Sequence, residues 1–228
     1  MTSVTRSSNN IKKLVSVAML CAVAYIVSFI CPIKVQFLTF DAKDSIIAIG
    51  GMFFGPLAAL FMSLIVPFLE FISISDTGIY GFIMNFLSSA AFSITASLVY
   101  KYKRKMSGAV IGLISAILAT TAVMFLANLY ITPYYMGVSR DTVAQLLPTL
   151  ILPFNLTKSL LNSGLVLLLY KPFTTALRAT KLVPPSENKR KPSITVTIIT
   201  IIASVIILSL ALFVYIVLLD GSVSFFGK

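Results

Sequence analysis

The sequence predicts an all-α protein that crosses the membrane several times. Of its 228 residues, 58% are hydrophobic and 11% are charged, and the mean hydropathy is +0.99. An ordinary soluble domain carries about twice that share of charged residues. Apolar runs of about 20 residues recur along the chain, and each is long enough to cross a hydrocarbon core about 30 Å thick. We therefore expect a polytopic helical membrane protein.

The first apolar run, residues 14–30, directly follows Lys12 and Lys13. It is too long for a typical signal peptide and is not followed by a small-residue cleavage pattern, so we interpret it as the first membrane span. A second uncharged stretch covers residues 45–69 and contains Gly50, Gly51, Gly55 and Pro56 in its first half. Glycine and proline at this density predict either a kink in one helix or a tight turn between two.

Positive charge favours the tight turn, because Lys and Arg collect on the cytoplasmic side of a membrane protein. The basic cluster at residues 101–105 falls on the same side as Lys12 and Lys13 only if residues 45–69 cross the membrane twice. Later spans are predicted at residues 78–99, 109–131, 147–170 and 194–219. The chain then has seven membrane helices, of which the second is short, and its N-terminus is cytoplasmic.

This topology divides the chain into five segments. Residues 1–11 form a cytoplasmic tail, residues 12–175 a six-helix membrane core, and residues 176–193 a basic cytoplasmic linker that contains Pro184, Pro185 and Pro192. Residues 194–219 form an additional transmembrane helix, and residues 220–228 a short external tail. The additional helix is almost wholly aliphatic, so we expect it to act as an anchor or accessory helix.

The net charge of +11 follows from the same topology. Thirteen of the 18 basic residues lie on the cytoplasmic side: Arg6, Lys12, Lys13, Lys101, Lys103, Arg104, Lys105, Lys171, Arg178, Lys181, Lys189, Arg190 and Lys191. These charges sit in short loops and a tail, which is typical of a multi-pass membrane protein in contact with the lipid bilayer. We expect no nucleic-acid partner.

Composition also excludes several kinds of chemistry. The chain has no His and only seven Asp and Glu residues, so we expect no histidine-ligated metal site and no catalytic residues. Thr157-Lys158-Ser159 has the last letters of a phosphate-binding loop but lacks the preceding glycines. A chain of this kind cannot hydrolyse ATP, and active movement of a solute would take its energy from a partner.

Polar side chains are costly inside a membrane, and those of this chain gather in the predicted outer half of the bilayer. Asn85, Asn128, Asn155 and Lys158 all fall within about 12 Å of the predicted outer helix ends. Asn155, Lys158 and Asn162 share one face of their helix, at positions i, i+3 and i+7. Each amide could instead only hydrogen-bond a neighbouring helix. The two predicted spans that supply Asn128 and Lys158 contain no carboxylate, so we expect Lys158 to face carbonyls, hydroxyls, water or a ligand.

The external loop at residues 34–44 combines aromatic and polar side chains, which suits a lid over a ligand. Phe37 and Phe40 can cover an apolar ring while Thr39 and backbone groups bond hydroxyls. The alternative is an interfacial aromatic belt, with Asp41 and Asp44 capping the second helix. For Asp44 we favour capping over ligand contact.

These residues resemble a known family, the substrate-binding S components of energy-coupling factor (ECF) vitamin transporters, and in particular their riboflavin-specific members. The resemblance covers about residues 12–175. The sequences that carry it are Phe37-Leu-Thr-Phe-Asp41 with Asp44, Gly50-Gly-Met-Phe-Phe-Gly-Pro-Leu-Ala58, Asn85-Phe86, Asn128, and Pro153-Phe-Asn-Leu-Thr-Lys158.

The resemblance implies a six-helix core that binds one riboflavin near the outer face, as a transported ligand and not a cofactor. By this resemblance, Asn128 and Asn155 would hydrogen-bond the polar edge of the flavin ring. Lys158, Leu38 and Thr39 would contact the ribityl hydroxyls or ring oxygens. Phe40 and Asn85 complete the substrate-binding residues that we expect.

The resemblance also implies partners. Ala18 and Ala22, a small-xxx-small pair on the first helix, would dock on a transmembrane coupling subunit that carries two ABC-type ATPase subunits. Two features depart from the family pattern: Phe82 stands where relatives often have Glu, and the seventh helix is additional. Two alternatives stay open, an S component for another vitamin and a non-transporting membrane scaffold.

Overall fold

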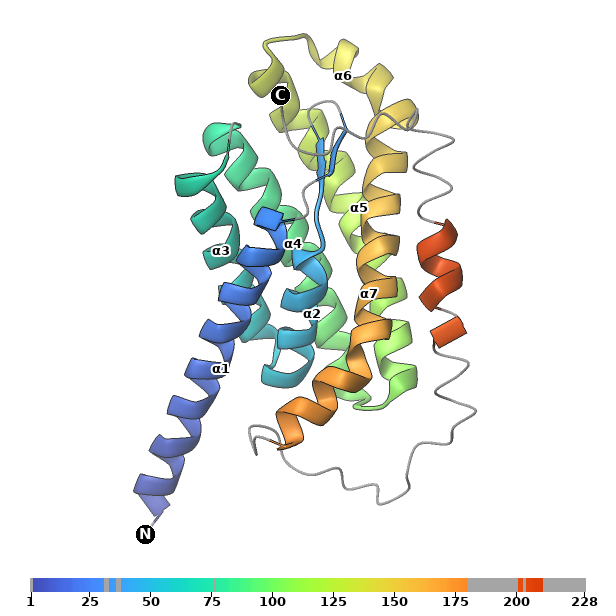
Figure 1. Cartoon of the computed structure of the whole chain (residues 1–228). Helices are drawn as coiled ribbons and strands as arrows, with labels where there is room; N and C mark the ends of the chain where they lie inside the picture. The colour runs from blue at the N-terminus through green and yellow to red at the C-terminus, as the bar shows by residue number, and fades with distance from the viewer. Residues whose placement is uncertain are drawn as a thin grey trace.

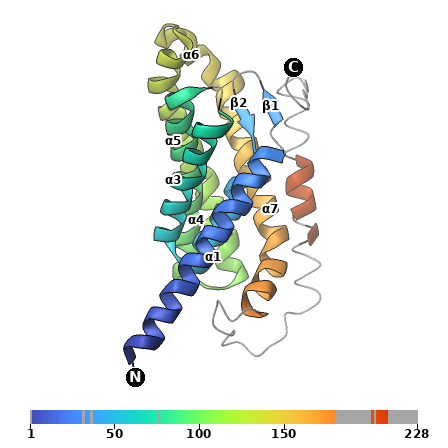
Figure 2. The same ribbon diagram turned by 60° about the vertical axis from the view of Figure 1, so that its left-hand side comes forward.

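A computed structural model describes residues 2–30, 33–35, 38–75, 77–179, 201–202 and 204–210. The chain forms a bundle of long helices with a small β-hairpin at one end, and α1 leans across the outside of the bundle (Figures 1 and 2). The all-α prediction is confirmed, although the hairpin was not predicted.

The helices follow the predicted order. They are α1 (Thr2–Ile30), α2 (Lys43–Phe54), α3 (Pro56–Ser73), α4 (Gly78–Tyr102), α5 (Met106–Met136), α6 (Arg140–Leu146) and α7 (Leu152–Ala179), with a π-helical turn at Leu147–Ile151 between α6 and α7. Within the described residues, five helical segments are long and apolar enough to span a membrane: Asn10–Ile30, Pro56–Ser73, Gly78–Tyr102, Met106–Met136 and Arg140–Ala176. The 12-residue α2 is the short second helix that the sequence predicts.

The glycine-rich stretch is a tight turn between two helices. Gly55 separates α2 from α3 at φ 99° and ψ 166°, a backbone region that only glycine adopts readily. Pro56 then begins α3 at the position where its missing N–H costs nothing. Gly51 has a different role, because a Cβ there would lie 2.7 Å from the Cβ of Ala59. The two glycines therefore allow α2 and α3 to turn back and pack closely.

The sixth predicted span is longer than expected and begins at Arg140 instead of residue 147. Ser139 caps α6 by accepting a hydrogen bond from the backbone N–H of Thr142 at 3.3 Å. Pro148 lies in the π-helical turn, where the N–H of Leu152 reaches the carbonyl of Leu147. The helix widens at the proline and does not end there, since the wider turn accommodates the missing N–H.

The hairpin pairs β1 (Ile33–Val35) with β2 (Leu38–Phe40) in antiparallel register, with Lys34 opposite Thr39. It brings β2 against the bundle, because Phe40 is buried and its ring centroid lies 4.2 Å from that of Phe154 in α7. The predicted lid thus contributes a strand, β2, that packs against α7. Phe37 and Asp76 lie outside the described residues.

The predicted linker and seventh helix fall mostly outside the described residues. Within the predicted seventh helix, residues 201–202 and 204–210 are helical, and Ile207 packs against the buried cluster that includes Val166 of α7. Figure 1 shows this segment beside α7, with α1 on the opposite side of the bundle. The division into five segments stays a prediction.

The turn between α2 and α3 allows a test of the packing. We expect Gly51→Leu to lower the melting temperature more than Gly55→Ala does. The Leu side chain would meet Ala59 and Ser97, whereas the Ala at position 55 meets no atom within 4 Å and costs only backbone strain, about 1–3 kcal/mol. Thermal unfolding of the purified protein in detergent measures both. A smaller effect for Gly51→Leu would show that α2 and α3 do not pack closely there.

Candidate functional site

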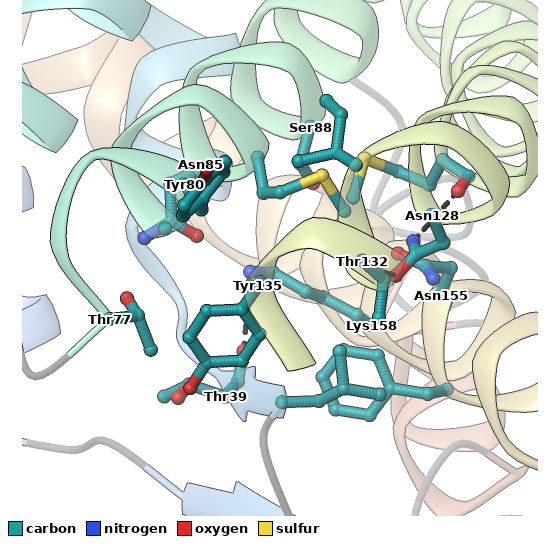
Figure 3. Close-up of a pocket in the computed structure, with 16 residues that line it drawn as sticks. Thr39, Thr77, Tyr80, Asn85, Ser88, Asn128, Thr132, Tyr135, Asn155 and Lys158 are labelled. Carbon is teal, nitrogen blue, oxygen red and sulfur yellow. Dashed lines mark hydrogen bonds between the residues drawn. The ribbon is translucent and has the colours of Figure 1, made fainter. Parts of the chain in front are cut away.

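A cavity of about 680 Å³ opens beneath the β-hairpin, between α4, α5 and α7. This volume includes the open, solvent-filled mouth of the cavity. Figure 3 shows its polar residues facing the cavity from β2 and the three helices. The lining residues are Leu38, Thr39, Thr77, Tyr80, Gly81, Met84, Asn85, Ser88, Met124, Asn128, Ile131, Thr132, Tyr135, Phe154, Asn155 and Lys158.

Six of the seven expected substrate-binding residues line this cavity: Leu38, Thr39, Asn85, Asn128, Asn155 and Lys158. Phe40 is not in the lining. Its ring contacts Phe154, which is, so Phe40 supports the wall from behind. Asn162, which shares the helix face of Lys158, also lies away from the cavity.

The side-chain amides of Asn128 and Asn155 each donate one hydrogen bond to a backbone carbonyl of their own helix. Asn128 Nδ2 donates to the Met124 carbonyl at 2.7 Å, and its Oδ1 accepts from Thr132 Oγ1 at 2.9 Å. Asn155 Nδ2 donates to the Ile151 carbonyl at 2.8 Å. Among the described residues, each amide keeps one N–H that is not used in these hydrogen bonds, and the bonds fix its orientation. The two side chains thus offer directed polar groups to the cavity.

Lys158 has a carboxylate partner, contrary to the expectation from its own helix. Its Nζ lies 2.9 Å from Asp41 Oδ2, 3.3 Å from the Thr39 carbonyl and 4.0 Å from Asp44 Oδ2. The partner comes from the segment between β2 and α2, about 117 residues earlier in the chain. The prediction considered only carboxylates within the two neighbouring spans and so missed it.

Lys43 extends this contact into a buried charge network. Its Nζ contacts the same Asp41 Oδ2 at 3.2 Å and Glu70 Oε2 at 2.7 Å. Glu70 Oε2 also accepts from Asn85 Nδ2 at 3.4 Å, so the network reaches the cavity at Asn85 as well as at Lys158. All the carboxylates and lysines of the network are buried, with Lys43 1% exposed.

Asp44 does not cap α2. The N-cap residue is Ala42, which makes no side-chain capping bond, and Asp44 Oδ1 instead accepts from Ser89 Oγ of α4 at 2.5 Å. Asp44 thus points into the bundle. The capping prediction was wrong because sequence alone does not show that α4 brings a hydroxyl beside this carboxyl group.

Asn162 fixes the start of α2 to α7. Its Nδ2 donates to the Asp41 carbonyl at 3.0 Å, and its Oδ1 accepts from the Ser45 N–H at 2.9 Å. Together with the ion pair between Asp41 and Lys158, these bonds attach the segment after β2 to α7 at two places. The hairpin is therefore held over the cavity by contacts 117 or more residues apart in the chain.

The charge network determines the state of Asp41. Burial alone would raise the pKa of Asp41, but the ammonium groups of Lys158 and Lys43 hold that pKa below its usual range. Asp41 is then an ionised acceptor at neutral pH. The positive charge of Lys158 is compensated by this carboxylate, so a ligand at the cavity wall meets little net positive charge.

Phe82, which stands where relatives often have Glu, is turned away from the cavity. Its ring lies among aromatic neighbours, 6.1 Å from that of Phe68 and 5.8 Å from that of Phe71. Glu70 supplies a carboxylate to Asn85 from α3 instead. The polar contact that is absent at position 82 thus has a counterpart from the neighbouring helix.

Several lining residues were not predicted. Ser88 follows Asn85 by three residues, and Met124 and Thr132 lie four residues either side of Asn128, so helical spacing alone would have found them. Tyr80 and Tyr135 come from the ends of α4 and α5 and are about two-fifths exposed. No sequence pattern placed them at the cavity, because helix ends carry tyrosines in most membrane proteins.

Comparison with known proteins identifies the family of this chain. The family described as "ECF transporter, substrate-specific component" matches residues 12–170, more than half of the chain. The chain belongs to this family. Its members are transporter subunits, so the chain is a multi-pass membrane transport component and not an enzyme, as predicted.

Individual relatives cover the same region. The riboflavin transporter RibU of Staphylococcus aureus (strain TCH60) is 31% identical over 177 residues, covering 73% of this chain and 93% of that protein. The riboflavin transporter FmnP of Bacillus subtilis (strain 168) is 26% identical over 184 residues, covering 74% and 97%. A solved S component of a bacterial ECF transporter matches with a TM-score of 0.64 and 29% identity, covering 74% of this chain and 99% of that one.

The ion pair at the hairpin can be tested by stability. We expect Asp41→Ala to lower the free energy of unfolding by about 3–5 kcal/mol, because it leaves two buried ammonium groups without their shared partner. Asp141→Ala, at an exposed position of α6, is the matched control and should change little. Thermal unfolding in detergent compares the two variants. Equal stability of both would contradict the role of Asp41.

Proposed function

We propose that this S component binds riboflavin at the outer side of a bacterial cell membrane and delivers it inward as part of an ECF-type importer. The observation that carries the proposal is the set of directed amides in the cavity, Asn128 and Asn155, in a chain that is 31% identical to a riboflavin transporter. Riboflavin is a flat, uncharged ring system with a polar edge and a hydroxylated chain.

The cavity suits each part of that molecule. Phe154, Leu38, Met84 and Met124 supply apolar and aromatic surface for a flat ring. The amides of Asn128 and Asn155 can bond the alternating carbonyl and N–H groups of the ring edge. Thr39 and Lys158, at the hairpin side, are placed to bond hydroxyls or ring oxygens.

The electrostatics suit an uncharged ligand. Lys158 is the one basic residue among the described lining residues, and its ammonium is already paired with Asp41 at 2.9 Å. These lining residues include no Arg to form the two-pronged hydrogen bonds that phosphate recognition commonly uses. The site therefore offers hydrogen bonds and apolar surface more than charge.

Transport also needs an energy source outside the chain. We propose that a transmembrane coupling subunit with two ABC-type ATPase subunits supplies it, and that α1 docks on this subunit through Ala18 and Ala22. Both residues are exposed on α1, where small side chains let another helix approach closely. The positive-inside pattern favours a cytoplasmic N-terminus.

Binding is tested by titrating purified protein into riboflavin and following the flavin fluorescence. We expect saturable binding at one riboflavin per chain, and we expect Asn155→Ala to raise the Kd about 10- to 100-fold, because polar atoms of the ring edge lose a buried partner. Thr149→Ala, at an exposed position outside the cavity, is the control and should bind normally.

A competition panel completes the binding test. Thiamine and pyridoxine should not displace riboflavin at equal concentration. Saturable binding of one of them, together with no saturable riboflavin binding, would assign the chain to another vitamin, and no saturable binding of any of the three would contradict a substrate-binding role.

Docking is tested separately from binding. We expect Ala18→Trp to leave the riboflavin Kd unchanged and to abolish riboflavin uptake by cells that contain the coupling partners, since the bulky ring blocks close helix contact. Leu118→Trp, on the exposed face of α5, is the matched control and should preserve uptake. Loss of binding in the Ala18 variant, or normal uptake, would contradict the assignment of this surface.

A further inference from the structure

The buried charge network contains five ionisable groups, so their charges cannot cancel when all five are ionised. It contains three carboxyl groups, those of Asp41, Asp44 and Glu70, but only two ammonium groups, those of Lys43 and Lys158. Each of the five residues is at most 6% exposed. With every group ionised, the network would hold one uncompensated negative charge away from water, which costs several kcal/mol in a protein interior.

The geometry shows which carboxyl group is least compensated. Asp41 Oδ2 accepts both ammonium groups, at 2.9 and 3.2 Å, and Glu70 Oε2 accepts Lys43 at 2.7 Å. Among the described residues, Asp44 has no ammonium group within hydrogen-bonding distance, since the nearest one there is that of Lys158 at 4.0 Å. Asp44 accepts a hydrogen bond from a neutral hydroxyl, Ser89 Oγ.

Among the side chains that the structure describes, no further charged group compensates Asp44 from the elements around it. In the described part of α4, the residues that face the network are Asn85 and Ser89, which are neutral, and α7 contributes Lys158. The segment before α2 contributes Asp41, α2 itself contributes Lys43, and α3 contributes Glu70. The Oδ1 atom of Asp41 and the Oε1 atom of Glu70 are buried and have no hydrogen-bond partner among the described residues, so the network contains unused acceptor oxygens.

We propose that Asp44 is a proton-binding site: its carboxyl group is held in the neutral, protonated form at physiological pH and makes the network electrically neutral. A carboxyl group beside another carboxylate in a buried site commonly keeps its proton for this reason. The inference deepens the proposed function, because a neutral network beneath the cavity suits an uncharged ring. It concerns the unliganded protein and can be tested without any ligand.

The proton also keeps Lys158 in place. If Asp44 loses its proton, its Oδ2 atom, 4.0 Å from Lys158 Nζ, competes with Asp41 for the same ammonium group. Lys158 would then shift from Asp41 and from the Thr39 carbonyl, and the contact between β2 and α7 would weaken. Ligand affinity should therefore fall as the pH rises through the range in which Asp44 ionises.

Infrared spectroscopy detects the proton directly. A protonated carboxyl group has a C=O stretching band that is separate from those of carboxylates and amides, and the chain has only seven Asp and Glu residues to contribute. At neutral pH we expect such a band in the unliganded protein. It should be absent in Asp44→Asn and unchanged in Asp141→Asn, an exposed control. The absence of the band in the wild type, or its persistence in Asp44→Asn, would overturn the proposal.

Isotope labelling gives a test that needs no variant. If Asp44→Asn does not fold, a wild-type sample with 13C in the aspartate carboxyl groups should show the band shifted to lower frequency. A band that does not shift would place the proton on a glutamate and overturn the assignment to Asp44.

The pH dependence of riboflavin binding provides the functional readout. We expect the wild-type Kd to rise at least fivefold between pH 7 and the alkaline limit of stability. Where Asp44 releases one proton, the free energy of binding weakens by about 2.303RT per pH unit. Asp44→Asn, which stays neutral, should show a flatter profile, and ionisation of the ligand affects both proteins equally. Identical profiles would contradict the link to binding. Failure of both proteins to bind riboflavin at neutral pH would contradict the proposed function and leave the infrared test of the proton decisive.

Discussion

The position of the hairpin depends on one carboxylate oxygen, Asp41 Oδ2, which accepts the ammonium groups of both Lys43 and Lys158. A buried ammonium group is stable only with a close partner, so these two contacts hold α2 and α7 against the segment after β2. Asn162 adds neutral hydrogen bonds to the same segment. The cavity exists beneath the hairpin because this junction keeps β2 over the ends of α4, α5 and α7.

The same junction sets the chemistry of the cavity. Lys158 forms an ion pair with Asp41, and Asn85 donates a hydrogen bond to Glu70. The lining therefore presents oriented hydrogen-bonding groups and little uncompensated charge. The backbone bonds of Asn128 and Asn155 likewise fix the direction of the remaining amide groups. Pre-oriented groups lose little conformational entropy when a rigid ligand binds, which favours selective binding of a flat, uncharged molecule.

The helical architecture could be predicted because it depends on local properties. Apolar run length predicts the spans, and the glycines at positions 50, 51 and 55, together with the distribution of positive charge, predict the tight turn. The face shared by Asn155, Lys158 and Asn162 follows from helix periodicity. The ion pairs could not be predicted, because Asp41 and Lys158 are joined by the folding of segments 117 residues apart. Asp44 illustrates the same limit, since it has the sequence context of a helix cap but bonds Ser89 of α4.

The identity of the small molecule that co-purifies with the protein tests the account most directly. The chain should be purified in mild detergent from cells grown with a mixture of vitamins, and the bound compounds extracted and identified by mass spectrometry. The account predicts one dominant compound, riboflavin, at close to one molecule per chain. A phosphorylated or otherwise charged compound at that stoichiometry, or no enriched compound at all, would contradict it.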